Sequence, residues 1–274
     1  MGIANRMQCN DYMMENDEET KRLIVKTDVE VVKQQARWAG IAPGMRLVDV
    51  GCGPGITTHT LDGLVQPGGS SLGFDLSGKR AAYGNQHYAG DTLKFEQRDA
   101  LNPLEDFGQF DFAWVRFVLE YHNTNSFELV QNVSKIVKPG GILCLIDLDY
   151  NCETHYGHSD RMGRALTEIL KNVQQKVNFD PYVGRKLYAY LYDLGYQDID
   201  VKVGAHHTIF GALKDSDDFN WTKKVEVAGR QNYDFAEYPG GFEEFREEFR
   251  TFFASHRRFT YTPIISCRGR KPLS

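Results

Sequence analysis

A short apolar segment that runs directly into a glycine-rich loop constrains this chain more than any other feature. Residues 46–50 read Arg-Leu-Val-Asp-Val, and Gly51, Gly53 and Gly55 follow at every second position. Apolar runs of this length are typical of buried parallel strands. Glycines at the end of such a strand let the backbone turn sharply and pass close to a ligand, because no Cβ intervenes. The segment therefore predicts a strand, a ligand-binding loop and a helix.

Strand and helix patterns alternate after this unit. Strands are expected at residues 46–50, 71–75, 93–99, 110–115, 142–148, 199–208 and 259–268, with helices at 56–65, 77–88 and 126–137. Such alternation predicts an α/β fold, in which a doubly wound, mostly parallel seven-stranded sheet carries helices on both faces. Ligands bind such sheets beyond the carboxyl ends of the strands, where the glycine loop lies.

The chain is expected to hold one sheet domain with a helical insertion. Its parts are an N-terminal helical lead-in at 1–43, the cofactor-binding sheet domain at 44–212 and 258–274, and a helical cap over the substrate site at 213–257. Within the lead-in, the pattern from Glu18 to Trp38 predicts a helix. The cap is rich in aromatic residues, including Trp221 and Tyr233, and a predicted helix at 160–177 is expected to help it cover the ligand.

Charge and cysteine usage narrow the class of partner. The formal net charge is −5, which argues against a nucleic-acid partner, because such partners need clustered basic residues. The five cysteines are scattered, as a reducing compartment permits. The chain shows no apolar run of membrane-spanning length and no N-terminal signal core. These features predict a cytoplasmic protein without a membrane segment that acts on a small molecule; the oligomeric state does not follow from them.

Two aspartates at successive strand tips indicate the kind of ligand. Asp75 ends the second predicted strand and is placed to accept hydrogen bonds from two ribose hydroxyls, and Asp99 ends the third, near an adenine amino group. A dinucleotide fingerprint would need a third glycine where Ile56 stands. The pattern therefore favours an adenosyl cofactor with a sulfonium and an amino-acid tail over a nicotinamide dinucleotide.

Five segments together resemble the class I S-adenosylmethionine-dependent methyltransferases. They are Val48–Gly55 for the first motif, Gly73–Ser77 for the second, Arg98–Ala100 for the third, Phe110–His122 for the fourth, and Lys138–Gly141 for the turn before the fifth strand. The resemblance covers residues 44–148 and is specific for the cofactor, not for the substrate. It implies S-adenosylmethionine as methyl donor and a last strand that runs antiparallel to the others.

The resemblance also implies which residues surround the cofactor. Asp49, Gly51, Cys52, Gly53 and Gly55 would hold the methionine part, Asp75 the ribose, and Leu76, Asp99 and Ala100 the adenine; Val115 and Arg116 would line the methyl-donor end, and Tyr12 would close over it.

No acceptor-specific signature is present. The fourth strand ends in Ala113-Trp114-Val115-Arg116 and lacks the Asn/Asp-Pro-Pro-aromatic sequence of amino-group methylation. Cys144 lies inside an apolar strand, where a structural role is expected rather than that of a nucleophile. Acidic residues follow the fifth strand but not the fourth, so no metal is expected.

Without such a signature, the sequence gives only candidates for the catalytic and substrate-binding residues. The candidates are His122 and Asp147 for catalysis, and Tyr121, Trp221 and Tyr233 for substrate contact. His206 and His207 fall in a predicted strand, so at most one of them faces the site, and a surface position is favoured. The leading interpretation is methyl transfer to a small-molecule acceptor by in-line displacement, which needs positioning more than a dedicated base. A protein or nucleic-acid methyltransferase and a non-enzymatic S-adenosylmethionine-binding module remain as alternatives.

Overall fold

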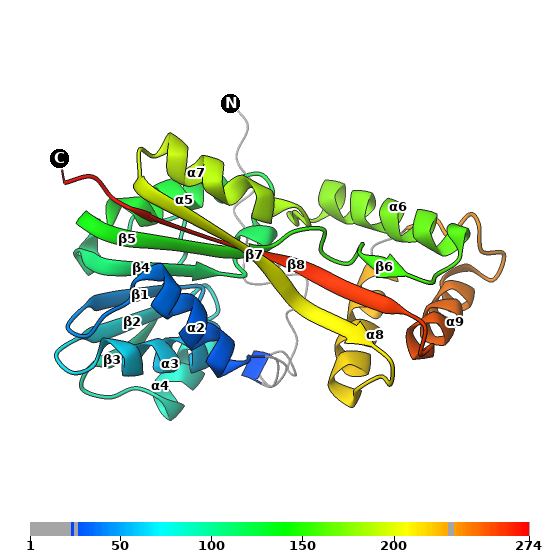
Figure 1. The fold of residues 1–274 in the computed structure, drawn as a ribbon, viewed down its shortest axis with the longest axis horizontal. Helices are drawn as coiled ribbons and strands as arrows, with labels where there is room; N and C mark the ends of the chain where they lie inside the picture. Colours follow the sequence, from blue (N-terminus) through cyan, green and yellow to red (C-terminus); the bar gives the residue numbers. More distant parts are fainter. Residues whose placement is uncertain (1–22, 25–26, 230–232, 274) are drawn as a thin grey trace.

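The computed structural model describes residues 23–24, 27–229 and 233–273 (Figure 1). Its elements in chain order are α2 (Val29–Ala39), β1 (Arg46–Val50), α3 (Ile56–Val65), β2 (Ser70–Asp75), α4 (Gly78–His87), β3 (Leu93–Gln97), η2 (Glu105–Phe107), β4 (Phe110–Arg116), η3 (Leu119–Tyr121), α5 (Ser126–Lys135), β5 (Val137–Leu148), β6 (His155–Tyr156), α6 (Asp160–Lys176), η4 (Val183–Lys186), α7 (Leu187–Asp193), β7 (Gln197–Phe210), α8 (Asp215–Gly229), α9 (Gly241–Ala254) and β8 (Phe259–Arg270).

One sheet organises the fold. The strands lie in the order β3-β2-β1-β4-β5-β8, and β7 pairs with β8 as well. Strands β1 to β5 pair in parallel, whereas β8 runs antiparallel to β5. This confirms the expected doubly wound, mostly parallel sheet and its antiparallel last strand. The two-residue strand β6 pairs with the start of β8 and adds a short eighth strand that the sequence did not predict.

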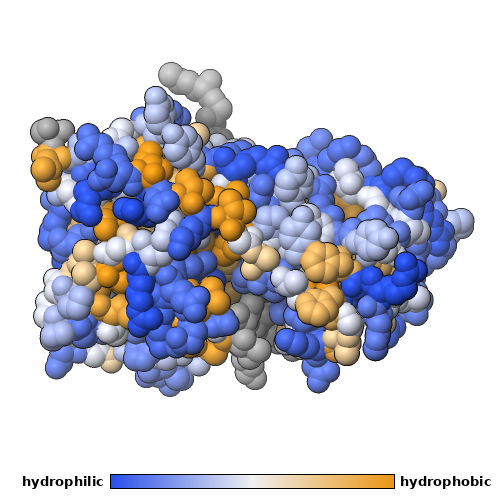
Figure 2. Space-filling view, viewed as in Figure 1, coloured by the Kyte–Doolittle hydropathy of each residue, from blue (hydrophilic) through white to orange (hydrophobic). Residues whose placement is uncertain are grey.

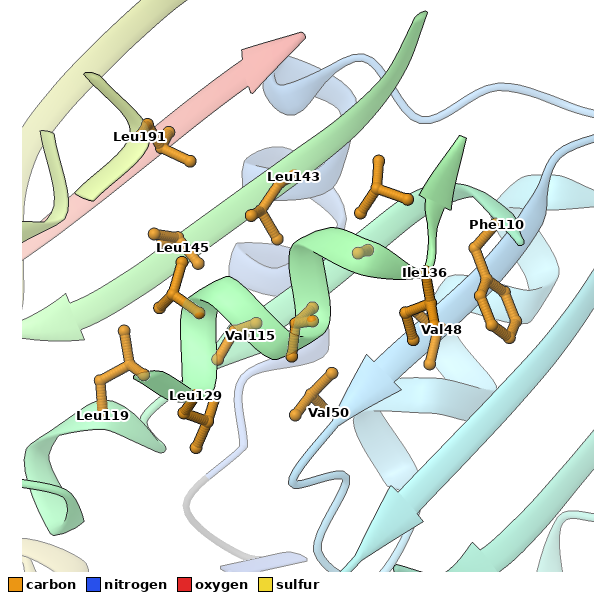
Figure 3. Packing of buried hydrophobic residues seen from close by; sticks show 14 of the residues in the cluster. Val48, Val50, Phe110, Val115, Leu119, Leu129, Ile136, Leu143, Leu145 and Leu191 are labelled. Atoms are coloured by element: carbon orange, nitrogen blue, oxygen red, sulfur yellow. The ribbon is translucent and has the colours of Figure 1, made fainter. Parts of the chain in front are cut away.

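Helices cover both faces of the sheet because successive strand residues point to opposite sides. In β4, Ala113 and Val115 belong to the apolar core beneath α5 and α7, while Phe112 and Trp114 belong to the core beneath α2 and α3. Figure 3 shows Leu129 of α5 packed over the strands that carry Val48, Val115 and Leu145. Both cores include residues of β1, the strand that leads into the glycine loop.

The helix predicted from Glu18 to Trp38 is not continuous. Leu23 and Ile24 are helical, Thr27 and Asp28 are not, and α2 begins at Val29; residues 18–22 lie outside the described part. The Asp28 carboxylate accepts hydrogen bonds from the backbone N–H groups of Glu30 and Val31, which satisfies donors that have no partner within the helix. Gly40 ends the helix at φ 99°, in the left-handed conformation that glycine adopts without a steric penalty.

Beyond the sheet, β7 and β8 continue as a long two-stranded ribbon that carries the helices α6, α8 and α9 (Figure 1). These helices, β6 and the adjoining ends of the two strands are called the helical lobe. Its buried core is strongly aromatic and includes Phe179, Trp221, Phe235, Tyr238, Phe245, Phe249, Phe252 and Phe253. Four residues of α6 lie in the same core, so α6 is packed with the predicted cap of residues 213–257 rather than on the sheet.

The outer side of β7 is open to solvent. Among the described strands, β7 pairs only with β8, and most of its residues are exposed. Figure 2 shows apolar residues gathered near the middle of a mostly hydrophilic face, and exposed apolar side chains on β7 include Val201, Val203 and Phe210. No helix in the described ranges has the length and hydropathy needed to cross a membrane.

Candidate active site

The glycine loop after β1 has a conformation that only glycine fits easily. Gly51, Gly53 and Gly55 have φ values of 67°, 56° and 97°. The loop is bound to the neighbouring strand, because the N–H groups of Gly51 and Cys52 both donate to the Phe74 carbonyl oxygen, at 2.8 and 3.0 Å. A Cβ on Gly55 would lie 2.6 Å from the Phe95 ring, so this glycine allows the helix α3 to approach β3.

Gly53 differs from the other two loop glycines. A Cβ there would meet only the Leu23 side chain, at 3.6 Å, among the described residues. Its N–H donates to Oδ2 of Asp75 at 2.9 Å, and the N–H of Ser77 donates to Oδ1 at the same distance. The carboxylate of Asp75 thus joins the glycine loop to the end of β2. Each of its oxygens has a further lone pair, which can accept a ribose hydroxyl.

These elements surround a cavity at the carboxyl ends of β1, β2 and β4, here called the cofactor cavity. Of the residues proposed from the sequence, those that line it are Gly51, Cys52, Gly53, Asp75, Leu76, Asp99, Ala100, Arg116, Tyr121 and His122. The structure therefore brings the glycine loop and both strand-tip aspartates together around one space. Their contacts with a cofactor remain a proposal.

Asp49 does not line the cavity. Its carboxylate is 2 % exposed and accepts a hydrogen bond of 2.7 Å from the Thr58 hydroxyl, at the start of α3. Burial raises the pKa of this carboxyl from 3.8 to about 7, and the Thr58 hydrogen bond and the charge of Arg116 act in the opposite direction. In this structure Asp49 supports the glycine loop from beneath.

Two more proposed residues lie outside the cavity lining. Gly55 begins α3 under the loop, and Val115 is fully buried in the core below α5. Tyr12 lies outside the described residues.

Asp147, a catalytic candidate, is also fully buried and lines no described cavity. Its oxygens accept hydrogen bonds from the N–H groups of Leu119, Glu120 and Leu148, at 2.9, 3.2 and 2.9 Å. Burial raises the pKa of Asp147, and the nearby Glu120 carboxylate raises it further. These contacts give Asp147 a structural role here: it fixes the turn that presents Glu120 and Tyr121.

The turn after β4 carries residues that sequence reasoning missed. Phe117 has φ 59°, an uncommon conformation for a bulky residue. Its ring packs against the Arg116 guanidinium at 4.0 Å and the His206 ring at 4.8 Å. Both Phe117 and His206 line the cavity, as does Glu120. The position of Glu120 just after the fourth strand was a usable signal, but the approach of His206 from β7 depends on tertiary structure.

His122, the other catalytic candidate, lines the cavity and is 9 % exposed. Its Nδ1 lies 3.2 Å from Oδ1 of Asn125. Burial lowers the pKa of this imidazole, so it is neutral near pH 7 and has the form that accepts a proton.

A second cavity adjoins the first, and Glu120 and Tyr121 line both. Trp221 lines this second cavity, whereas Tyr233 lines neither and packs edge-on against Phe235 at 4.7 Å. Within the described ranges, no group of three or more His, Cys, Asp and Glu side chains is arranged to hold a metal ion.

Comparisons with known proteins agree with this geometry. Residues 48–145 match the family model described as a methyltransferase domain. Demethylmenaquinone methyltransferase of Bacillus mycoides (strain KBAB4) is 29% identical over 120 residues, covering 41% of this chain and 49% of that protein. The chain spans about half the length of the curated relatives it matches.

Solved structures share the fold at low identity. A proposed methyltransferase of Bacillus halodurans C-125 has a TM-score of 0.56 and 15% identity, covering 89% of this chain and 99% of that one. The cyclase SpnF has a TM-score of 0.52 and 17% identity, covering 90% and 82%. The fold alone therefore does not specify the reaction.

The family match and the fold together define the class. Residues 48–145 match a methyltransferase domain, and the fold is that of the class I, Rossmann-like methyltransferases, as the sequence resemblance predicted. S-adenosylmethionine is the methyl donor of this class. The cavity fits it, because the loop leaves open space at Gly53 and Asp75 keeps lone pairs for the ribose.

Proposed function

We propose that this protein transfers the methyl group of S-adenosylmethionine to a small-molecule acceptor. The observation that carries the proposal is the shared wall of Glu120 and Tyr121 between the cofactor cavity and the second cavity. A molecule in the second cavity would meet the cofactor at this wall. Residues 213–257, together with α6, then form the substrate-binding cap, and the rest of residues 44–212 with residues 258–274 forms the cofactor-binding domain.

S-adenosylmethionine supplies a methyl group that is already activated by the sulfonium. When bound, it would supply this group as the methyl–sulfur bond breaks and the acceptor–methyl bond forms, with the electron pair left on sulfur. The protein binds and orients: the loop from Gly51 to Gly53 receives the methionine part, and Asp75 the ribose. Arg116, Phe117 and Tyr121 surround the far end and exclude water. If the acceptor loses a proton, His122 and Glu120 are within the cavity lining to receive it.

A small acceptor is favoured over a macromolecule on two grounds. The Bacillus relatives are named demethylmenaquinone methyltransferases, and demethylmenaquinone is a small molecule. The second cavity is lined by residues of η3, the end of β5, the loop that follows it and the helices α6, α8 and α9, and concave sites of this kind suit small molecules. The net charge of −5 adds no support for nucleic acid. The scattered cysteines favour a reducing compartment, for which we propose the cytoplasm.

Two measurements test the proposal. Calorimetry with S-adenosylhomocysteine measures cofactor binding without any acceptor. Incubation with methyl-labelled S-adenosylmethionine and a fractionated small-molecule extract then measures transfer. We expect binding, and label in a small-molecule fraction. The absence of binding would overturn the cofactor assignment, and label found only in protein or nucleic acid would overturn the acceptor class.

A further inference from the structure

The second cavity lies between the sheet domain and the helical lobe. Its walls come from η3, the end of β5, the loop that follows, and helices α6, α8 and α9. Most of the lining is apolar, including Ile169, Val173, Trp221, Phe245 and Phe249. The rings of Trp221 and Phe249 lie 6.3 Å apart and within 26° of parallel. Flat apolar surfaces of this kind favour a ligand with a ring-bearing, apolar body.

One wall of this cavity is polar and consists of three linked side chains. Nδ2 of Asn151 donates to Oε2 of Glu120 at 2.7 Å, and Nζ of Lys224 donates to Oδ1 of Asn151 at 3.1 Å. Glu120 and Asn151 are each 4 % exposed. The amide orientation follows from the charges, since its NH₂ group faces the carboxylate and its oxygen faces the ammonium.

The loop that supplies Asn151 has an unusual backbone. The residues on either side of it, Tyr150 and Cys152, have φ values of 47° and 73°. Such conformations cost non-glycine residues roughly 1–3 kcal/mol each and persist only where the surroundings hold them. Here Arg185 binds both carboxylate oxygens of Asp149, at 2.9 and 3.1 Å, and anchors the loop. The loop thereby presents Asn151 and Cys152 to the cavity.

Among the residues that the structure describes, Lys224 is a cation without a carboxylate partner. Of the described residues, none places a carboxylate oxygen within 4.0 Å of its Nζ. Its contacts are neutral: Oδ1 of Asn151, Sγ of Cys152 at 3.4 Å, and the Trp221 ring at 4.7 Å. The adjacent Lys223 does pair, with Glu226 at 3.4 Å. A charge beside an apolar cavity is stabilised by an opposite charge, and an ammonium can donate three hydrogen bonds.

We propose that the second cavity binds the methyl acceptor, and that the acceptor is an apolar, ring-bearing organic anion. Its carboxylate or phenolate oxygen pairs with Lys224, and its ring lies against Trp221. Asn151 accepts a hydrogen bond from Lys224 and donates one to Glu120, so it positions the ammonium at the cavity wall and lies between the two charges. This assignment rests on the proposed function, because it takes the shared wall as the place of methyl transfer.

The charge preference is tested with two probes of similar shape, 2-naphthoate and the neutral 2-naphthylmethanol. Calorimetry is carried out on the full chain with S-adenosylhomocysteine present. We expect the native protein to bind naphthoate at least about ten-fold more tightly than the alcohol, because a charge-assisted hydrogen bond is added. Lys224→Met should remove this preference, and the matched control Lys223→Met should keep it. Equal affinity for both probes, no binding of naphthoate, or an unchanged preference in Lys224→Met would overturn the proposal.

Cys152 reports where the probe binds. Its thiol is half-buried and lines the second cavity. Saturating naphthoate should slow its alkylation by iodoacetamide, measured by peptide mapping, in the native protein but not in Lys224→Met. Unchanged alkylation in the native protein would place the probe elsewhere and overturn the assignment. Failure of the proposed function is a separate result: S-adenosylhomocysteine would not bind, whatever the naphthoate measurements give.

Discussion

The sheet domain and the helical lobe are stabilised by different kinds of core. Eight of the fourteen buried residues in the lobe's core are aromatic, against four of twenty-one in the core beneath α5 and α7. Aliphatic side chains from alternating strand positions fill the sheet domain evenly. The lobe instead relies on a few large rings, which come from α8, α9 and the loops beside the helices, and a cavity remains between α6, α8 and α9. The stability of the lobe therefore depends on few side chains, whereas that of the sheet domain, which forms most of the cofactor cavity, depends on many.

The largest expected effect is a loss of stability in the helical lobe that leaves the sheet domain folded. Phe253 is 2 % exposed, and its ring lies 5.3 Å from those of Trp221 and Phe249. Phe253→Ala should cost about 3–5 kcal/mol by removing buried surface and leaving a cavity. Hydrogen exchange should then rise in α6, α8 and α9, while calorimetry shows unchanged binding of S-adenosylhomocysteine.

Phe219→Ala is the matched control, because Phe219 is on α8 but 45 % exposed. It should change the free energy of unfolding by well under 1 kcal/mol. If Phe253→Ala weakens cofactor binding as strongly as it destabilises the lobe, the two regions unfold as one unit and the contrast between them is wrong.

The second effect belongs to the sheet domain and depends on pH. The pKa of Asp49 is 3.8 in the ordinary case and about 7 in the fold. Between these values the unfolded chain has released the proton that the folded protein keeps, so stability falls as pH rises from about 4 to about 7, and then levels off. The displacement from 3.8 to about 7 corresponds to at most about 4 kcal/mol.

Asp49→Asn should abolish this pH dependence while retaining an acceptor for the Thr58 hydroxyl. Urea unfolding at pH 5 and pH 8 measures the free energy of unfolding of both proteins. Relative to the native protein, the variant should be more stable at pH 8 than at pH 5. If the free energies of unfolding of the variant and the native protein differ by the same amount at both pH values, Asp49 is not protonated in the fold.

The third effect tests the glycine loop. Gly53 and Gly44 both have positive φ, at 56° and 82°, and each has open space for a Cβ. Valine at either position should strain the backbone by a similar amount, but only Gly53 lines the cofactor cavity. Gly53→Val should weaken binding of S-adenosylhomocysteine at least about 100-fold, or about 2.7 kcal/mol, by filling that space. Gly44→Val should leave the affinity within about two-fold; equal losses in both variants would show a folding defect instead of a blocked site.

Much of the sheet domain could be predicted because its signals are local. The strands β1 and β2 and the helix α3 lie within a residue of their expected bounds. The expected third strand ended at Asp99, whereas β3 ends at Gln97. The same locality explains why the glycine loop and Asp75 were identified: each follows a strand of recognisable pattern.

The lobe and the second cavity could not be predicted in the same way. Strand β6 has two residues, too few to show a pattern, and it pairs with β8 more than 100 residues later. The polar wall joins Glu120, Asn151 and Lys224 from three separate segments, and only the fold brings them together. Asp147 looked like a strand-tip acid that could face substrate. Its orientation toward three backbone N–H groups depends on the turn after β4.

The smallest expected effect concerns the ribose. In the cavity each oxygen of Asp75 already accepts one backbone N–H. These hydrogen bonds stabilise the carboxylate when the ribose displaces water from it, so the ribose hydroxyls can bind at a lower cost. Asp75→Ala should weaken binding of S-adenosylhomocysteine by at least about ten-fold, or about 1.4 kcal/mol. Calorimetry with the 2′-deoxy analogue separates this contact from loop damage. The native protein should bind the analogue more weakly than S-adenosylhomocysteine, whereas the variant should bind both alike, since the partner of the hydroxyl is gone. A variant that still distinguishes the two ligands would show that another residue holds the 2′-hydroxyl, and that Asp75 serves only to tie the glycine loop to β2.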